Sequence, residues 1–245
     1  MLQRLSTFVL RPLATLIGKS YPAPMRPRLL SALVLTAVLA GCSALPGQRP
    51  SERPGTGAVT SGISRPDDAQ CLAALSATGA RYSPLADRYY APGCQALGSV
   101  RLDRLAGDRG SFALANLGPV ACPLAQAFAG WARFGVDRAA RQILGSPLAR
   151  IETMGSYSCR TVAGRTRLSA HARAEAIDIG AFVLEDGRRV SVKDGWNGGS
   201  DQERAFLRTV HASACKRFGT VLGPGYNAAH ADHFHVELGT GSFCR

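Results

Sequence analysis

Residues 176–183 read AIDIGAFV, an alternation of apolar side chains with small or polar ones that predicts a half-buried β-strand. Ile177 and Ile179 share one face of this strand with the apolar side chains that follow them. Asp178 therefore projects from the opposite face. That position makes Asp178 a candidate site residue and makes this strand the starting point for the fold.

A second alternating segment, residues 233–238, reads HFHVEL. Phe234 and the later apolar residues face one way, whereas His233, His235 and Glu237 face the other. Two imidazoles about 7 Å apart along one strand face can both line a single site. The two segments together therefore predict one shared polar centre.

The histidines are concentrated around these two strands. Four of the five lie in residues 169–178 and 230–235. Histidine and aspartate are zinc ligands, and three protein ligands with one open position form the catalytic type of zinc site. His171 lies seven residues before Asp178 in a segment without strand character, so a loop must bring it back over the strand. The fifth histidine, His211, lies in an expected helix, where a structural role suits it best.

Helices are expected around the strands. The clearest spans residues 123–144, with apolar side chains at helical spacing and Pro123 in the first turn. Ser200 and Glu203 form a capping box for a helix that runs to about residue 218, and residues 69–79 show a short helical pattern. These features predict an α+β fold, in which a small antiparallel sheet carries a zinc site and is flanked by helices and stapled by disulfides.

Six cysteines follow Cys42 in the chain: Cys71, Cys94, Cys122, Cys159, Cys215 and Cys244. If the chain is exported, as its N-terminal residues indicate, an even number of cysteines indicates disulfides rather than free thiols. A cysteine zinc site is not indicated, because the sequence has no Cys-x-x-Cys pair. Six cysteines allow about 15 connectivities. We favour the sequential one, because short loops close most easily: Cys71–Cys94, Cys122–Cys159 and Cys215–Cys244.

The N-terminal 41 residues resemble an export signal. They contain five basic residues, no acidic residue and an apolar run over residues 29–40 that is too short to span a bilayer comfortably. Residues 39–42, LAGC, resemble the bacterial lipobox, in which Cys42 is lipidated and becomes the new N-terminus. Ser43 resembles an outer-membrane sorting signal, and Met25 would start a complete signal by itself. A plain secretory signal or an anchor helix is the alternative.

Composition divides the mature chain into a tether and a domain. Residues 42–68 are rich in Pro, Gly, Ser and Thr and predict a flexible, lipid-anchored linker before a single domain over residues 69–245. Loss of residues 1–41 removes five positive charges and lowers the formal net charge from +12 to +7. The chain has no basic run with interleaved aromatic residues, so a nucleic-acid partner is not favoured. An acidic envelope polymer or an anionic lipid surface suits this charge better.

The spacing of the candidate ligands resembles a known metal motif. Ser-x-His-x(6)-Asp followed by His-x-His is similar to the motif of the peptidase group that contains lysostaphin, D-Ala-D-Ala carboxypeptidases and the hedgehog signalling domain. Over about residues 70–245 the chain more closely resembles the bacterial extensin-like C-terminal domain family, through YSCR (157–160), LSAH (168–171), AIDIGAF (176–182), LGPGYN (222–227) and HADHFHVE (230–237). Ala174 departs from the pattern, which usually has Gly there, so a left-handed backbone at this position would be strained.

The resemblance implies that His171, Asp178 and His235 bind zinc. His233 would then be the base that takes a proton from water at the metal, whose pKa zinc can lower to about 7. Arg160, beside Cys159, would hold a substrate carboxylate or the oxyanion of a tetrahedral intermediate.

Three further residues are candidates for supporting roles around the zinc site. His230 and Asp232 could orient the ligand imidazoles, with a solvated turn as the alternative. Glu237 lies one step further along the same strand face, where we expect it to pair with an arginine.

These expectations favour a zinc-dependent peptidase of the bacterial envelope that hydrolyses peptide bonds in peptidoglycan, as a carboxypeptidase or an endopeptidase. Its partners would be peptidoglycan or its stem peptides, and the membrane through the N-terminal lipid. Its place would be the outer membrane, facing the periplasm. The alternatives are a non-catalytic, zinc-bearing binding module and a structural lipoprotein of the cell wall. A free base such as His233 distinguishes catalysis from a closed structural zinc site.

Overall fold

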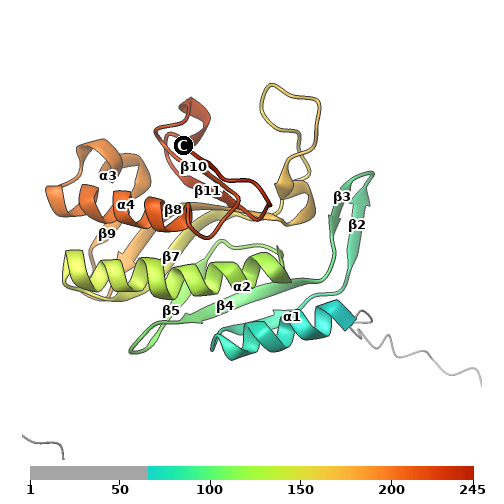
Figure 1. Cartoon of the computed structure of the whole chain (residues 1–245), viewed down its shortest axis with the longest axis horizontal. Coiled ribbons are helices and arrows are strands. Elements are labelled where there is room, and N and C mark those ends of the chain that lie inside the picture. The colour runs from blue at the N-terminus through green and yellow to red at the C-terminus, as the bar shows by residue number, and fades with distance from the viewer. Residues whose placement is uncertain (1–65) are drawn as a thin grey trace, which may run out of the picture. The chain divides into compact units, whose positions relative to one another are not determined.

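The computed structural model describes residues 66–245 (Figure 1). The predicted signal over residues 1–41, the lipid attachment at Cys42 and nearly all of the predicted linker lie outside the described residues. The first helix, α1 (Pro66–Ala77), begins inside the range assigned to the linker. Within residues 66–245, every helix is too short or too polar to span a bilayer.

The main sheet has ten strands, eight of them in the order β1-β4-β5-β7-β8-β11-β10-β12, while β6 pairs with β4 and β9 with β8. Their bounds are β1 Arg81–Pro84, β4 Ser99–Ala106, β5 Ser111–Ala115, β6 Val120–Ala121, β7 Leu148–Gly155, β8 Ala176–Leu184, β9 Arg189–Ser191, β10 Thr220–Leu222, β11 Phe234–Glu237 and β12 Phe243–Cys244. A separate two-stranded sheet pairs β2 (Arg88–Ala91) with β3 (Cys94–Ala96).

The prediction of a small antiparallel sheet is wrong in the number of strands and in their relative orientation. The sheet is mixed, because β5 pairs with β7 and β10 pairs with β12 in parallel. The segment between β5 and β7 contains a long helix, and such a crossover returns the chain parallel to its starting strand. The α+β class itself is confirmed.

The two strands that carry the candidate ligands are neighbours. The predicted strand over residues 176–183 is confirmed as β8, nearly all of whose side chains are buried, and β8 lies between β7 and β11. The antiparallel pairing of β8 with β11 places His235 directly opposite Asp178. Two segments separated by more than fifty residues in the sequence are thus brought to one point of the sheet.

Helices complete the core. α2 (Cys122–Trp131) continues through wider helical turns to Leu144, as predicted for residues 123–144, and ends at Gly145 in a left-handed conformation. α4 (Asp201–Ala214) begins with the predicted capping box, and α3 (Val192–Gly198) precedes it. The indole Nε1 of Trp131 in α2 donates to Ser213 Oγ of α4 over 3.0 Å, which joins these two helices, drawn one above the other in Figure 1.

The disulfides correct the predicted connectivity. Cys215–Cys244 is present as predicted, but the sequential pairs Cys71–Cys94 and Cys122–Cys159 are wrong: Cys71 binds Cys122, and Cys94 binds Cys159. The observed bonds span 51 and 65 residues. Each doubling of loop length costs only about 0.6 kcal/mol in closure entropy. Tertiary packing, which sets α1 against α2, therefore decides the pairing.

Candidate metal centre

Three buried side chains from separate segments converge on one point. His171, Asp178 and His235 offer ligand atoms that all lie within 4.8 Å of one another. His171 Nε2 lies 3.1 Å from Asp178 Oδ2, His235 Nδ1 lies 2.7 Å from Asp178 Oδ1, and the two ring nitrogens are 3.2 Å apart. Two imidazole nitrogens and one carboxylate oxygen are a donor set that zinc accepts. The residues present therefore fit a zinc ion.

A tight turn carries His171 back over the sheet, as the sequence requires. Ala170–Arg173 form one 3₁₀ turn, whose first residue follows Ser169, and the Ser169 hydroxyl accepts from the His171 amide. The turn ends at Ala174 in the left-handed region, with φ 57°. A left-handed alanine costs about 1–2 kcal/mol. The Ala174 amide donates to His171 O and Ala174 O accepts from Ala121, which holds this conformation.

Hydrogen bonds to the outer nitrogens set both imidazoles for metal binding. His171 Nδ1 donates to the carbonyl of Ser156 over 3.1 Å, which leaves the Nε2 lone pair directed at Asp178 and His235. His235 Nε2 donates to Glu237 Oε1 over 2.7 Å, which leaves Nδ1 as the atom directed at Asp178. A carbonyl or carboxylate behind each histidine is the usual support of a metal ligand.

The cluster without metal carries strongly shifted pKa values. Burial alone would raise the pKa of Asp178, but hydrogen bonds from His171 and His235 outweigh it and hold that pKa well below its usual range. Burial alone would lower the pKa of His235, but its hydrogen bonds to Asp178 and Glu237 raise it to about 9. Burial would raise the pKa of Glu237, and the hydrogen bond from His235 instead lowers it. The site therefore favours a positive charge between its carboxylates.

His233 lies beside this cluster without belonging to the close group of three. Its Nε2 is 3.6 Å from Asp178 Oδ1, and its Nδ1 is 2.8 Å from Asp232 Oδ1. Asp232 thus contacts His233 rather than a ligand imidazole. His230 bonds to Asn227 Oδ1 over 2.7 Å, and its ring lies 5.2 Å from that of His233. Burial lowers the pKa of His230 to about 4, with smaller contributions from charge repulsion by His233 and His235.

The cluster opens into a cavity of about 580 Å³. His233, His235 and Glu237 line it, whereas His171 and Asp178 are not among its lining residues. Arg160 lines it as well, with Nη2 3.9 Å from Asp178 Oδ2 and a side chain that is 49% exposed. Cys159, immediately before Arg160, is bonded to Cys94 of β3. The structure therefore brings His235, His233 and Arg160 to one cavity, with His171 and Asp178 buried beside His235.

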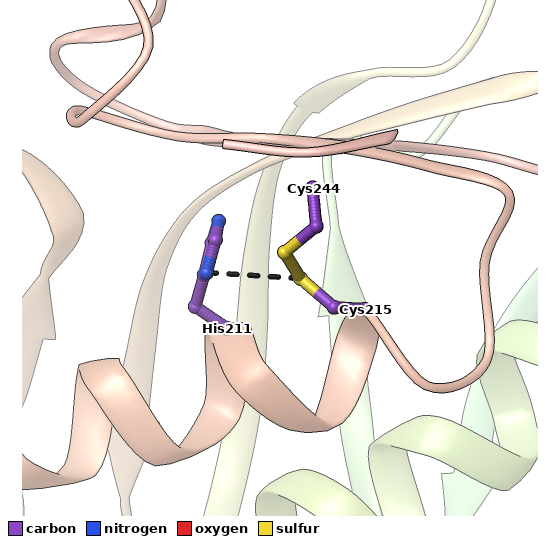
Figure 2. A group of neighbouring side chains, drawn as sticks. All are labelled: His211, Cys215 and Cys244. Carbon is purple, nitrogen blue, oxygen red and sulfur yellow. Dashed lines mark hydrogen bonds between the residues drawn. A yellow bond between two sulfur atoms is a disulfide. The ribbon is translucent and has the colours of Figure 1, made fainter. Parts of the chain in front are cut away.

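A second group of ligand-type residues lies elsewhere. His211 in α4 approaches Cys215, and its Nδ1 is 3.9 Å from Cys215 Sγ (Figure 2). Cys215 and Cys244 are bonded to each other, so neither offers a thiolate. His211 Nε2 donates to the carbonyl of Arg245, its ring packs against Trp196 and Phe234, and burial lowers its pKa. These contacts fit the structural role predicted for His211.

The contacts of two supporting residues, Glu237 and Ser156, were not predicted from the sequence. Glu237 was expected to pair with an arginine, but it accepts from His235 instead. Its place two positions along the same strand from His235 was a usable signal, because such side chains share one face. Ser156 acts through its backbone carbonyl, for which no side-chain pattern exists.

Comparison with known proteins gives one family. The family model described as "Extensin-like protein C-terminus" matches residues 69–245, which is most of the chain. Neither the curated proteins nor the solved structures yield a match.

Proposed function

This chain belongs to the extensin-like protein C-terminus family, and we propose that it is a zinc-dependent peptidase that hydrolyses peptide bonds in peptidoglycan. One observation carries the proposal. His171, Asp178 and His235 converge beside a cavity that His235 lines, and a further histidine, His233, with a carboxylate behind it, lines the same cavity. A purely structural zinc site needs no such base and closes its fourth position.

In this proposal His171, Asp178 and His235 hold the zinc ion. When bound there, zinc would supply Lewis acidity, polarising the scissile carbonyl and making water more acidic. The Ser156 carbonyl and Glu237 keep the two imidazoles in the required tautomer. The protein thus presents a preorganised set of donors whose orientation does not depend on the substrate.

His233 is the proposed general base. Asp232 accepts a hydrogen bond from Nδ1, so Nε2 keeps its lone pair and lies on the side of Asp178 and the cavity. From that position Nε2 would take the proton of the attacking water and later deliver it to the leaving amine. Arg160 would hold a substrate carboxylate or the developing oxyanion, because its guanidinium lies at the same end of the cavity.

The alternative of a zinc-bearing binding module uses the same cavity without turnover. The Asp232–His233 pair favours chemistry over that alternative, since binding alone requires no oriented base. The cellular part of the proposal is a lipid anchor at Cys42 in the outer membrane, facing the periplasm. Radiolabelled fatty acid should attach to the wild type and not to Cys42→Ala, and equal labelling of both would contradict the anchor.

The decisive experiment is incubation of the zinc-loaded protein with purified peptidoglycan sacculi, followed by mass analysis of released fragments. Hydrolysis should add one water per bond cleaved and should depend on zinc. Protein treated with a chelator and the His233→Ala variant serve as controls. If the zinc-loaded wild type releases nothing beyond these controls, the peptidase proposal fails and the binding module takes its place.

A further inference from the structure

One wall of the cavity is a hairpin formed by residues 160–169, drawn as the yellow-brown loop beside β2 and β3 in Figure 1. Thr161 and Leu168 form an antiparallel bridge at its centre. The amide of Ser169 donates to the Arg160 carbonyl, and the amide of Val162 donates to the Arg167 carbonyl, each over 3.0 Å. The segment is therefore an ordered hairpin with a defined pairing.

This pairing separates the hairpin into two faces. Residues directly opposite each other in an antiparallel pair project to the same side, and the next pair projects to the other side. Arg160 opposite Ser169, and Val162 opposite Arg167, therefore share one face, and all four line the cavity. Arg165 lines it from the tip.

The other face anchors the hairpin to the small sheet. Leu168 packs so closely on Gly93, in the turn between β2 and β3, that a Cβ at Gly93 would lie 2.4 Å from Leu168 Cδ1. The Cys94–Cys159 disulfide fixes the base of the hairpin to β3. The face with the arginines is thus held toward the cavity by a covalent bond and by packing.

The guanidinium groups on this wall are available to a ligand. Within residues 66–245, Arg165 and Arg167 have no hydrogen bond or ion pair with a carboxylate, and both are exposed. Among the described residues, Glu237 is the single carboxylate that lines the cavity, and it already accepts from His235. Arg167 is near enough to lower the pKa of Glu237, after the larger effects of burial and of the two histidines. The cavity therefore carries an excess of positive charge beside the metal centre.

We propose that Arg165 and Arg167 bind carboxylates of the peptide substrate at a distance from the reacting bond. The substrate class is then an acidic peptide with at least two carboxylates: one for Arg160 near the candidate metal centre, and another for the tip of the hairpin. Guanidinium groups recognise carboxylates through paired hydrogen bonds. That the bound peptide is a substrate rests on the proposed peptidase function, whereas its binding to these arginines does not.

The test measures binding rather than turnover. The probe is the peptide acetyl-Ala-Glu-Ala-Ala with a free C-terminus, and its neutral counterpart has Gln in place of Glu and an amidated C-terminus. Calorimetric titration of the wild type, with and without zinc, should show at least about tenfold tighter binding of the acidic peptide. The preference should shrink as ionic strength rises.

The double variant Arg165→Gln/Arg167→Gln should lose most of this preference, roughly tenfold in Kd for the acidic peptide. The matched control, Arg81→Gln/Arg109→Gln, removes the same charge from two exposed arginines away from the cavity lining and should keep it. Circular dichroism verifies that both variants fold. Should the Gln pair not fold, Arg165→Lys/Arg167→Lys replaces it and should weaken binding to a smaller extent.

Three results would overturn the inference: equal affinity for the two peptides, no binding of either peptide, or an acidic preference that survives loss of Arg165 and Arg167. These outcomes are separate from the fate of the peptidase proposal. Acid-selective binding without hydrolysis of sacculi would support the hairpin as a carboxylate receptor and reject the enzyme. Hydrolysis without acid-selective binding would support the enzyme and reject the hairpin as a carboxylate receptor.

Discussion

Two groups of metal-ligand residues in this protein make an instructive pair. His171, Asp178 and His235 form one group, and His211, Cys215 and Cys244 form the other, each with ligand atoms within 4.8 Å. In the second group the sulfurs are bonded to each other, as Figure 2 shows, and the histidine is held by packing. In the first group every ligand atom is free to share one ion.

The difference shows that proximity of suitable residue types does not by itself make a metal site. His171 and His235 each have an acceptor behind the outer nitrogen, and both lie against the same carboxylate. His211 also has an acceptor, the main-chain oxygen of Arg245, but its Nδ1 faces the Sγ atom of Cys215, which is uncharged because it is part of a disulfide. Tautomer, charge and an open direction therefore distinguish the candidate metal centre from the structural group.

The largest expected effect comes from removing two ligands. His171→Ala/His235→Ala should abolish zinc binding, because Asp178 alone cannot replace a three-residue donor set. His211→Ala should retain one zinc per chain, since that histidine faces a disulfide. Elemental analysis of the purified proteins measures both. Unchanged zinc in the double variant, or loss of zinc in His211→Ala, would reverse the comparison.

The next largest effect concerns His233, which lies at the first group without being one of its three ligands. His233→Ala should keep zinc and fold but lose about 10²–10⁴-fold in turnover, the usual contribution of a general base. Zinc content and release of fragments from sacculi are measured on the same sample. If His233→Ala loses zinc as completely as His235→Ala, His233 is a fourth ligand and the site is closed.

A third effect sharpens the role of the second group as a structural staple. Replacing Cys215 and Cys244 by Ser removes a crosslink that spans 29 residues, and loop closure predicts a cost of about 3–4 kcal/mol in the free energy of unfolding. Zinc content should not change. Urea denaturation measures the stability of the variant, and elemental analysis measures its zinc. In the wild-type domain, thiol counting after denaturation without reduction should find none of the six cysteines free. A loss of zinc in the Ser variant would connect the two groups.

The sequence predicted the strands that carry Asp178 and His235 better than it predicted the disulfide pairing and the sheet topology around them. Period-two alternation around Asp178 and His235 is a local property, so the residues alone identify the two strands and the faces of their side chains. The pairing of Cys71 with Cys122 depends on how α1 packs against α2, and the parallel β5–β7 pair depends on a crossover through α2. Neither is a local property. The Ser156 carbonyl behind His171 has no side-chain signature at all.

The smallest predicted effect tests the support behind a ligand. Glu237→Gln keeps the shape of the side chain but removes the charge that accepts from His235 Nε2. Loss of such a partner typically weakens metal binding by about 10- to 100-fold. We expect that loss in zinc affinity at pH 9, measured by competition with a chelator. Glu185→Gln, at an exposed position outside both groups, is the control.

The pH dependence of the same titration gives a second, independent reading. In the metal-free wild type the pKa of His235 is raised from 6.5 to about 9, so zinc must displace a proton below that pH and its affinity should rise as pH rises to about 9. The raised pKa also stabilises the metal-free fold, fully below pH about 6.5, and this contribution disappears as pH rises through about 9. Glu237→Gln removes one cause of the shift, so the rise in affinity should end at a lower pH. An unchanged pH profile in Glu237→Gln would mean that Asp178 alone sets the charge of His235, and that Glu237 does not support the metal centre.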